Sequence, residues 1–157
     1  MKHSKEYYMS KAILEAKKAL LSDEVPIGCV IVQNDKIIAR GFNLKENKKL
    51  VSSHAEMEAI KKASKKLDNW RLLDCDLYVT IEPCLMCMGA IYQSYIRNVY
   101  FGAKDPSGGA VSSSLNFSEI PNLNHYPHIE GGILEEECSS LIKDYFKNKR
   151  ESKKKLK

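Results

Sequence analysis

Two short motifs in this chain contain the residue types that bind metals and transfer protons. The first reads His-Ala-Glu and runs from His54 to Glu56; the second reads Pro-Cys-Leu-Met-Cys and contains Cys84 and Cys87. Two thiolates and an imidazole favour zinc, and three protein ligands leave the metal a fourth position for water. The Glu56 carboxylate beside that water could accept its proton and pass it to a substrate. Together the motifs indicate a hydrolytic zinc centre with His54, Cys84 and Cys87 as ligands.

Each of these residues also has an ordinary structural interpretation. A Cys-x-x-Cys pair can belong to a hydrophobic core or to a redox centre. A histidine at a helix start is often solvated or caps the helix, and the helix dipole would favour Glu56 there. In a regular helix the side chains of His54 and Glu56 point about 200° apart. The metal interpretation therefore requires that the start of the helix, or the length of Glu56, bring both side chains to the metal.

Both motifs open predicted helices, and the rest of the chain predicts the sheet that must hold them. Apolar residues at helical spacing predict helices over residues 4–21, 54–67, 84–94 and 134–150. Ser4 is the expected N-cap of the first helix. Short apolar runs predict strands over residues 27–32, 37–42, 76–81, 98–102 and 128–130. The first two strands form a hairpin, and loops are expected at 43–53 and, with a short helical turn, at 103–127.

This order of elements predicts an α/β fold with three layers, α/β/α. Helices should cover both faces of a mixed five-stranded sheet that is parallel in its later part. With 157 residues, we expect one domain over residues 1–150, followed by a basic tail over residues 151–157. No apolar run approaches the ~20 residues of a membrane span, and the charged N-terminus lacks the core of a signal peptide. We therefore expect a cytoplasmic protein whose five cysteines stay reduced, which favours metal binding or catalysis over disulfides.

The charge is concentrated at the C-terminal end. The last fifteen residues carry eight Lys/Arg and two Asp/Glu, whereas the whole chain has a net charge of +5. A basic patch that includes Tyr145 and Phe146 suits a phosphate-rich partner. A solvated, partly frayed tail explains the same composition, so charge alone leaves both interpretations open.

The H-x-E…P-C-x-x-C pattern is the signature of zinc nucleobase deaminases. With it come "EVPIGCVIV", "LYVTIEPCLMCMGAI", "VYFGAKDPSGG" and "GILEEECSSLIKDYFKNKR". In these stretches the chain resembles the bacterial tRNA-specific adenosine deaminases of the cytidine/deoxycytidylate deaminase superfamily. The resemblance implies the cytidine-deaminase-like fold and one Zn²⁺ per subunit. It also implies hydrolysis of adenosine to inosine at the wobble position of tRNA anticodons, by a homodimer with no organic cofactor and no membrane contact.

The resemblance also implies roles for individual residues. His54, Cys84 and Cys87 match the zinc ligands, Glu56 matches the proton carrier, and Asn43 matches the residue that hydrogen-bonds the adenine. The positions that match the family's contacts to the tRNA anticodon stem-loop are Lys104, Asp105, Tyr145, Phe146, Lys147 and Arg150. From sequence context alone, Asn43 could equally be a turn residue at the end of a strand. Of the two aromatics, one could face the core and the other solvent.

Two segments depart from the family pattern, and two other functions stay open. "VSSH" at residues 51–54 and the segment 110–117 differ from the family, which affects the expected loop shape and the range of tRNAs accepted. A guanine deaminase on the same scaffold would act on the free base. A non-catalytic RNA-binding protein with structural zinc would need a fourth ligand, for which Cys29 or Cys75 would serve. Otherwise Cys29, Cys75 and Cys138 are expected to be small buried apolar residues.

Overall fold

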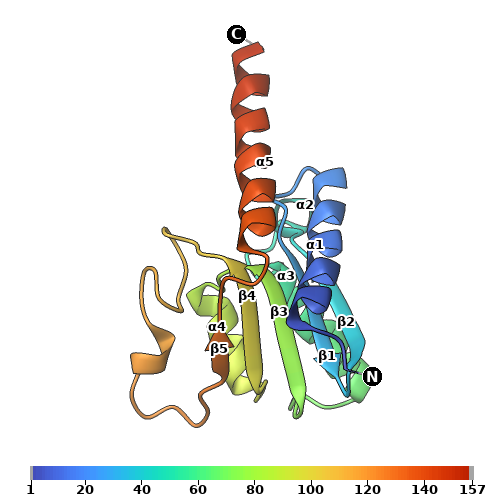
Figure 1. Ribbon diagram of the computed structural model, residues 1–157, viewed down its shortest axis with the longest axis vertical. Helices are drawn as coiled ribbons and strands as arrows, with labels where there is room; N and C mark the ends of the chain where they lie inside the picture. The colour runs from blue at the N-terminus through green and yellow to red at the C-terminus, as the bar shows by residue number, and fades with distance from the viewer. Residues whose placement is uncertain (1, 156–157) are drawn as a thin grey trace.

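The computed structural model describes residues 2–155, which form a five-stranded sheet with helices on both faces (Figure 1). The elements in chain order are α1 (Lys5–Leu21), β1 (Gly28–Gln33), β2 (Lys36–Phe42), α2 (Lys45–Lys48), α3 (Ala55–Leu67), β3 (Cys75–Ile81), α4 (Leu85–Gln93), β4 (Asn98–Ala103), the 3-10 turn η1 (Phe117–Glu119), β5 (His128–Glu130) and α5 (Glu135–Lys155). Ser4 caps α1 as predicted, its side chain accepting a hydrogen bond from the backbone N–H of Tyr7. The predicted three-layer α/β fold is confirmed.

The strands lie in the order β2-β1-β3-β4-β5. The strand β1 is antiparallel to both β2 and β3, whereas β3, β4 and β5 run parallel to one another. The later part of the sheet is therefore parallel, as predicted. Because the carboxyl ends of parallel strands meet at one edge, the segments that follow β3 and β4 lie beside each other there.

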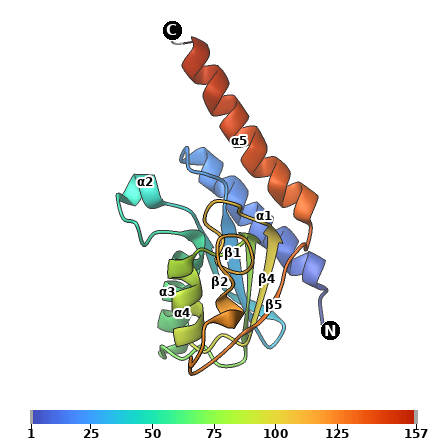
Figure 2. The same cartoon turned by 90° about the vertical axis from the view of Figure 1, so that its left-hand side faces the viewer.

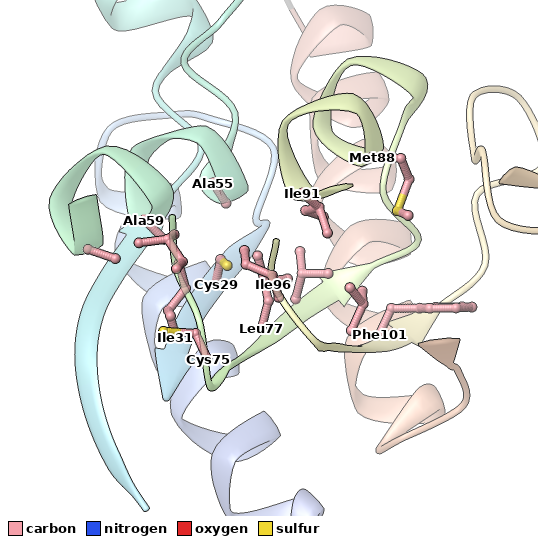
Figure 3. Packing of buried hydrophobic residues seen from close by; sticks show 14 of the residues in the cluster. Cys29, Ile31, Ala55, Ala59, Cys75, Leu77, Met88, Ile91, Ile96 and Phe101 are labelled. Carbon is pink, nitrogen blue, oxygen red and sulfur yellow. The ribbon is translucent and has the colours of Figure 1, made fainter. Parts of the chain in front are cut away.

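Helices α1 and α5 cover one face of the sheet, and α3 and α4 cover the other (Figure 2). Successive side chains of β1 alternate between the two cores. Cys29 and Ile31 lie on the α3/α4 side (Figure 3), and Val30 and Val32 lie on the α1 side. Cys29, Cys75 and Cys138 are all buried among apolar residues, as predicted.

Small residues let the helices approach the sheet closely. A Cβ atom on Gly28 would lie 2.1 Å from the backbone oxygen of Ala12 in α1. On the other face, a Cβ atom on Gly41 would lie 2.5 Å from the backbone oxygen of Ala55 in α3. The glycines of β1 and β2 thus bring both helices within backbone contact of the sheet, which fixes the start of α3 relative to the strands.

Two predicted segments differ from the structure. The predicted loop at 43–53 contains the short helix α2, which is held by hydrogen bonds from its backbone to the buried Glu24 carboxylate. The last helix does not end at Arg150 but continues to Lys155. Lysine and glutamate are good helix formers, and lysines in the last turn complement the helix dipole. Residues 156–157 of the predicted tail lie outside the described residues.

Within residues 2–155, no helix combines the length and the apolar character that crossing a bilayer requires.

Candidate active site

The two motifs occupy equivalent positions at the starts of α3 and α4. His54 is the N-cap of α3 and Cys84 is the N-cap of α4, and both have extended backbone conformations. Neither side chain makes the usual capping hydrogen bond, so both are free to bind another group. Since His54 precedes the helix, the rotation of about 200° expected inside a regular helix does not apply to the pair His54 and Glu56.

Three ligand atoms from these elements converge. The Nδ1 atom of His54 lies 3.6 Å from the Sγ atom of Cys84 and 3.6 Å from that of Cys87. Tetrahedral zinc with usual bond lengths of about 2.3 Å to sulfur and 2.0–2.1 Å to nitrogen would place these atoms about 3.6 Å apart. The donor set and its spacing therefore fit zinc.

The cluster contains three protein ligands. Within residues 2–155, His54, Cys84 and Cys87 form the single group of three or more His, Cys, Asp or Glu side chains that could hold a metal ion. The Sγ atom of Cys29 lies instead near the carbonyl oxygen of Val30, and that of Cys75 near the carbonyl oxygen of Leu73. Neither cysteine is therefore the fourth ligand that structural zinc would need, and residues 2–155 offer no other His, Cys, Asp or Glu to this cluster. Three ligands are typical of catalytic zinc.

The surroundings shift the pKa values of the two thiols in opposite directions. A hydrogen bond from Cys87 lowers the pKa of Cys84 to about 4, with smaller contributions from His54. The same hydrogen bond and burial raise the pKa of Cys87 above its usual value. One thiolate therefore forms readily, and a bound metal ion would displace the proton of the second.

Glu56 lies beside the ligands in a small cavity of about 150 Å³. His54, Cys84 and Asn43 line the same cavity. The Glu56 side chain is buried, and burial raises its pKa to about 7. A carboxyl group with a pKa near neutrality can both accept and return a proton under physiological conditions.

Residues 2–103 match the family model described as the cytidine and deoxycytidylate deaminase zinc-binding region. The chain belongs to the cytidine and deoxycytidylate deaminase family. The matched region contains all three ligands of the cluster, so the cofactor of this deaminase is one Zn²⁺ per chain.

Similar proteins extend this likeness over most of the deaminase. The chain is 46% identical, over 95% of its length, to 92% of a tRNA-specific adenosine deaminase of Bacillus subtilis. It is 42% identical, over 92% of its length, to 95% of a tRNA-specific adenosine deaminase of Agrobacterium fabrum. A solved structure from work on A-to-I editing by tRNA:A34 deaminases at the wobble position of transfer RNA has a TM-score of 0.83 and 42% identity. That likeness covers 86% of this chain and 98% of the other.

Asn43 lies directly after β2 on the wall of the deaminase cavity. Its Oδ1 atom accepts a hydrogen bond from the backbone N–H of Lys45 at 3.2 Å, and its Nδ2 atom donates to the carbonyl oxygen of Val25 at 3.4 Å. Asn43 is therefore a turn residue whose side chain also lines the cavity, and its predicted contact with adenine stays a prediction.

The residues expected to contact RNA fall into two places in the deaminase. Asp105 lines the cavity, and the neighbouring Lys104 is exposed. The other four lie on the outer half of α5 and do not line the cavity. Figure 1 shows α5 extending away from the sheet, beyond the other elements.

The two aromatic residues of α5 have different surroundings. The Tyr145 hydroxyl donates a hydrogen bond to the carbonyl oxygen of Asp23 at 3.2 Å, and Lys149 forms an ion pair with the Asp23 carboxylate at 2.6 Å. These contacts attach α5 to the end of α1. Phe146 is 44% exposed, and Lys147 and Arg150 are exposed as well. Tyr145 thus faces the protein while Phe146 faces solvent.

Two buried carboxylates, Glu24 and Glu82, were not predicted from the sequence, and Glu82 lines the cavity. Glu24 accepts hydrogen bonds from the backbone of Glu46 and Asn47, and Glu82 accepts them from the loop after β4. One signal was available for Glu82, because "VTIEPC" has a charged residue at the end of an otherwise apolar strand. Such a residue is buried only when it is paired or fully hydrogen-bonded.

Proposed function

We propose that this protein hydrolyses adenosine to inosine at the wobble position of tRNA anticodons, with release of ammonia. The observation that carries the proposal is a group of three side chains that can bind one metal ion, next to a small cavity that also contains the buried Glu56. The similarity of nearly the whole chain to tRNA-specific adenosine deaminases supports the choice of substrate. Because the cavity is small, an adenine base must leave its stack to enter it.

In this proposal His54, Cys84 and Cys87 hold the zinc ion. Zinc, when bound there, would act as a Lewis acid that lowers the pKa of a water molecule. The Glu56 carboxylate takes a proton from the attacking water and delivers it to N1 of the adenine. It then carries a second proton to the amino group that leaves from C6. One water molecule is consumed and one ammonia molecule is released, so no redox partner is required.

Asn43 would orient the adenine base so that its N1 atom faces the Glu56 carboxylate. A side-chain amide offers a donor and an acceptor to a purine edge. The burial of Asn43 on the cavity wall, and its contacts with the backbone of Lys45 and Val25, support this role because they restrict its orientation.

The anticodon loop would extend from the cavity along Lys104 and Asp105 towards α5. There the exposed Phe146 could stack on a base splayed from the loop, while Lys147 and Arg150 meet phosphates. We further propose that the protein acts in the cytoplasm as a homodimer, which the resemblance to the family supports. Light scattering of the zinc-loaded protein would measure the oligomeric state.

The test uses an unmodified tRNA with adenosine at the first anticodon position. It is incubated with the zinc-loaded wild type and with Glu56→Ala, digested to nucleosides, and analysed for inosine. We expect inosine from the wild type and none from the variant, with equal zinc contents in the two proteins. A zinc-loaded wild type that binds the tRNA without forming inosine would contradict the proposal. Guanine would then be the next substrate to test.

A further inference from the structure

A buried carboxylate connects the metal-ligand segment to the loop after β4. Glu82 lies two positions before Cys84, and its side chain is 1% exposed. Its Oε1 atom accepts hydrogen bonds from the backbone N–H of Asp105 at 3.1 Å and from the Ser113 hydroxyl. Its Oε2 atom accepts from three successive backbone N–H groups, of residues 111, 112 and 113, at 3.0, 2.9 and 3.1 Å. Both oxygens are therefore fully engaged by the loop.

These hydrogen bonds satisfy the buried carboxylate of Glu82. Five donors, four of them backbone N–H groups, point at its two oxygens, and a carboxylate can be buried only with such partners. An ionised carboxylate whose lone pairs are all occupied has no free position from which to exchange protons with a substrate. Glu82 thus differs from Glu56, which lies in the same cavity.

The loop lies directly against the ligand segment. The backbone N–H of Ala110 donates to the carbonyl oxygen of Pro83 at 2.8 Å, and Cys84 pairs with Gly109 in an isolated antiparallel bridge. A Cβ atom on Gly109 would lie 2.2 Å from the Cδ atom of Glu82. No side chain fits between the loop and the carboxylate, so the loop can move only if these contacts break.

We propose that Glu82 is a positioning residue that fixes the segment 104–113 as one wall of the substrate cavity. Through the N–H of Asp105 it determines where Asp105 stands relative to the metal ligands, because Glu82, Asp105 and Cys84 all line the cavity. The expected effect of Glu82 on turnover rests on the proposed function. The expected effect of Glu82 on the segment 104–113 does not depend on that function.

Glu82→Gln tests the proposal because it preserves the shape of the side chain. The single amide oxygen can accept from the turn at 111–113, but the NH₂ group then faces the N–H of Asp105, donor against donor. Since hydrogen bonds to charged groups contribute about 1.5–3 kcal/mol, we expect roughly tenfold to hundredfold faster amide exchange across residues 105–113. We expect kcat/KM for the tRNA to fall by about the same factor, with zinc content unchanged.

Ser113→Ala is the matched control. It removes one neutral hydroxyl and leaves every backbone N–H in place, so the loss in kcat/KM should stay below about tenfold. Asp105→Ala completes a double-mutant cycle with Glu82→Gln. If Glu82 acts through Asp105, Glu82→Gln costs much less kcat/KM in the Asp105→Ala background than in the wild type.

A second variant approaches the same contact from the loop. Gly109→Ala pushes the loop away from an intact Glu82 carboxylate and should reproduce the faster exchange and the lower kcat/KM. It decides the question if Glu82→Gln fails to fold. The proposal is overturned if exchange at 105–113 is unchanged in the folded variants, if faster exchange leaves kcat/KM intact, or if zinc is lost. If the wild type forms no inosine, the proposed function is wrong. The exchange measurement would still test whether Glu82 holds residues 105–113 in place.

Discussion

The metal centre and the outer half of α5 hold their functional side chains in opposite ways. His54, Cys84 and Cys87 sit at the starts of two helices that pack on the buried sheet. The outer half of α5, residues 145–155, extends beyond the other elements and contacts Asp23 through Tyr145 and Lys149, and Cys138 near its base is the buried residue of the helix. One region is built on a core and the other extends into solvent.

The difference follows from the range of the forces involved. Bonds to zinc tolerate deviations of about 0.2 Å, so the ligands need rigid support. Attraction between cations and phosphates extends over the Debye length of about 8 Å at physiological salt, so a projecting helix is adequate. We therefore expect variants of the metal centre to abolish chemistry, and variants of outer α5 to weaken binding gradually.

The largest effect is expected from Cys87→Ala. Removing one of three ligands should release zinc, and activity should fall by at least about a thousandfold because the metal supplies the activated water. Metal analysis and inosine formation measure the two losses. Cys75→Ala is the matched control, since Cys75 is buried away from the ligands. Retention of zinc by Cys87→Ala would show that the ligand assignment is wrong.

A smaller effect is expected from reversing charge on outer α5. Lys147→Glu with Arg150→Glu should raise KM for tRNA by about tenfold to a hundredfold, leave kcat unchanged, and reduce the salt dependence of binding. Lys61→Glu with Lys62→Glu makes the same charge change on the exposed side of α3. If both pairs weaken binding equally, α5 is not a specific contact and only the net charge matters.

A smaller effect again is expected from acid pH, through the protonation of Glu56 in the cavity. Glu56 must be ionised to accept a proton, and burial raises its pKa above that of a free glutamate. The rate should therefore fall as pH decreases through a range above the usual glutamate pKa of about 4.3. The measurement is kcat for the zinc-saturated enzyme against pH. A rate that is constant down to the usual glutamate range would separate Glu56 from the rate-limiting proton transfer.

The smallest effect concerns the rigidity of the core itself. Gly28→Ala places a methyl group against the backbone of α1 and should destabilise the fold by about 1–3 kcal/mol. Gly89→Ala in α4 meets no atom within 4 Å and should stabilise it by roughly 0.5–1 kcal/mol. Thermal unfolding of both variants measures the difference. Equal melting temperatures would contradict the close packing of α1 on β1.

The sequence was most informative where residue type and local spacing determine the outcome. The ligand cluster and the five strands could be predicted, because metal preference and apolar periodicity act within a few positions. By contrast, α2 was missed because it depends on Glu24, which lies more than twenty positions earlier. The role of Glu82 was missed for the same reason, since its partners come 23 to 31 positions later.

Glu24 and Glu82 both bind mainly backbone N–H groups rather than side chains. Every amino acid except proline supplies the same N–H, so most side chains in the attached loops can be exchanged while the loop keeps its path. The departure of residues 110–117 from the family pattern therefore leaves the backbone N–H groups of residues 111–113 available to bind Glu82. Such an arrangement lets a lineage alter what its loops contact while the position of the reacting atoms is preserved.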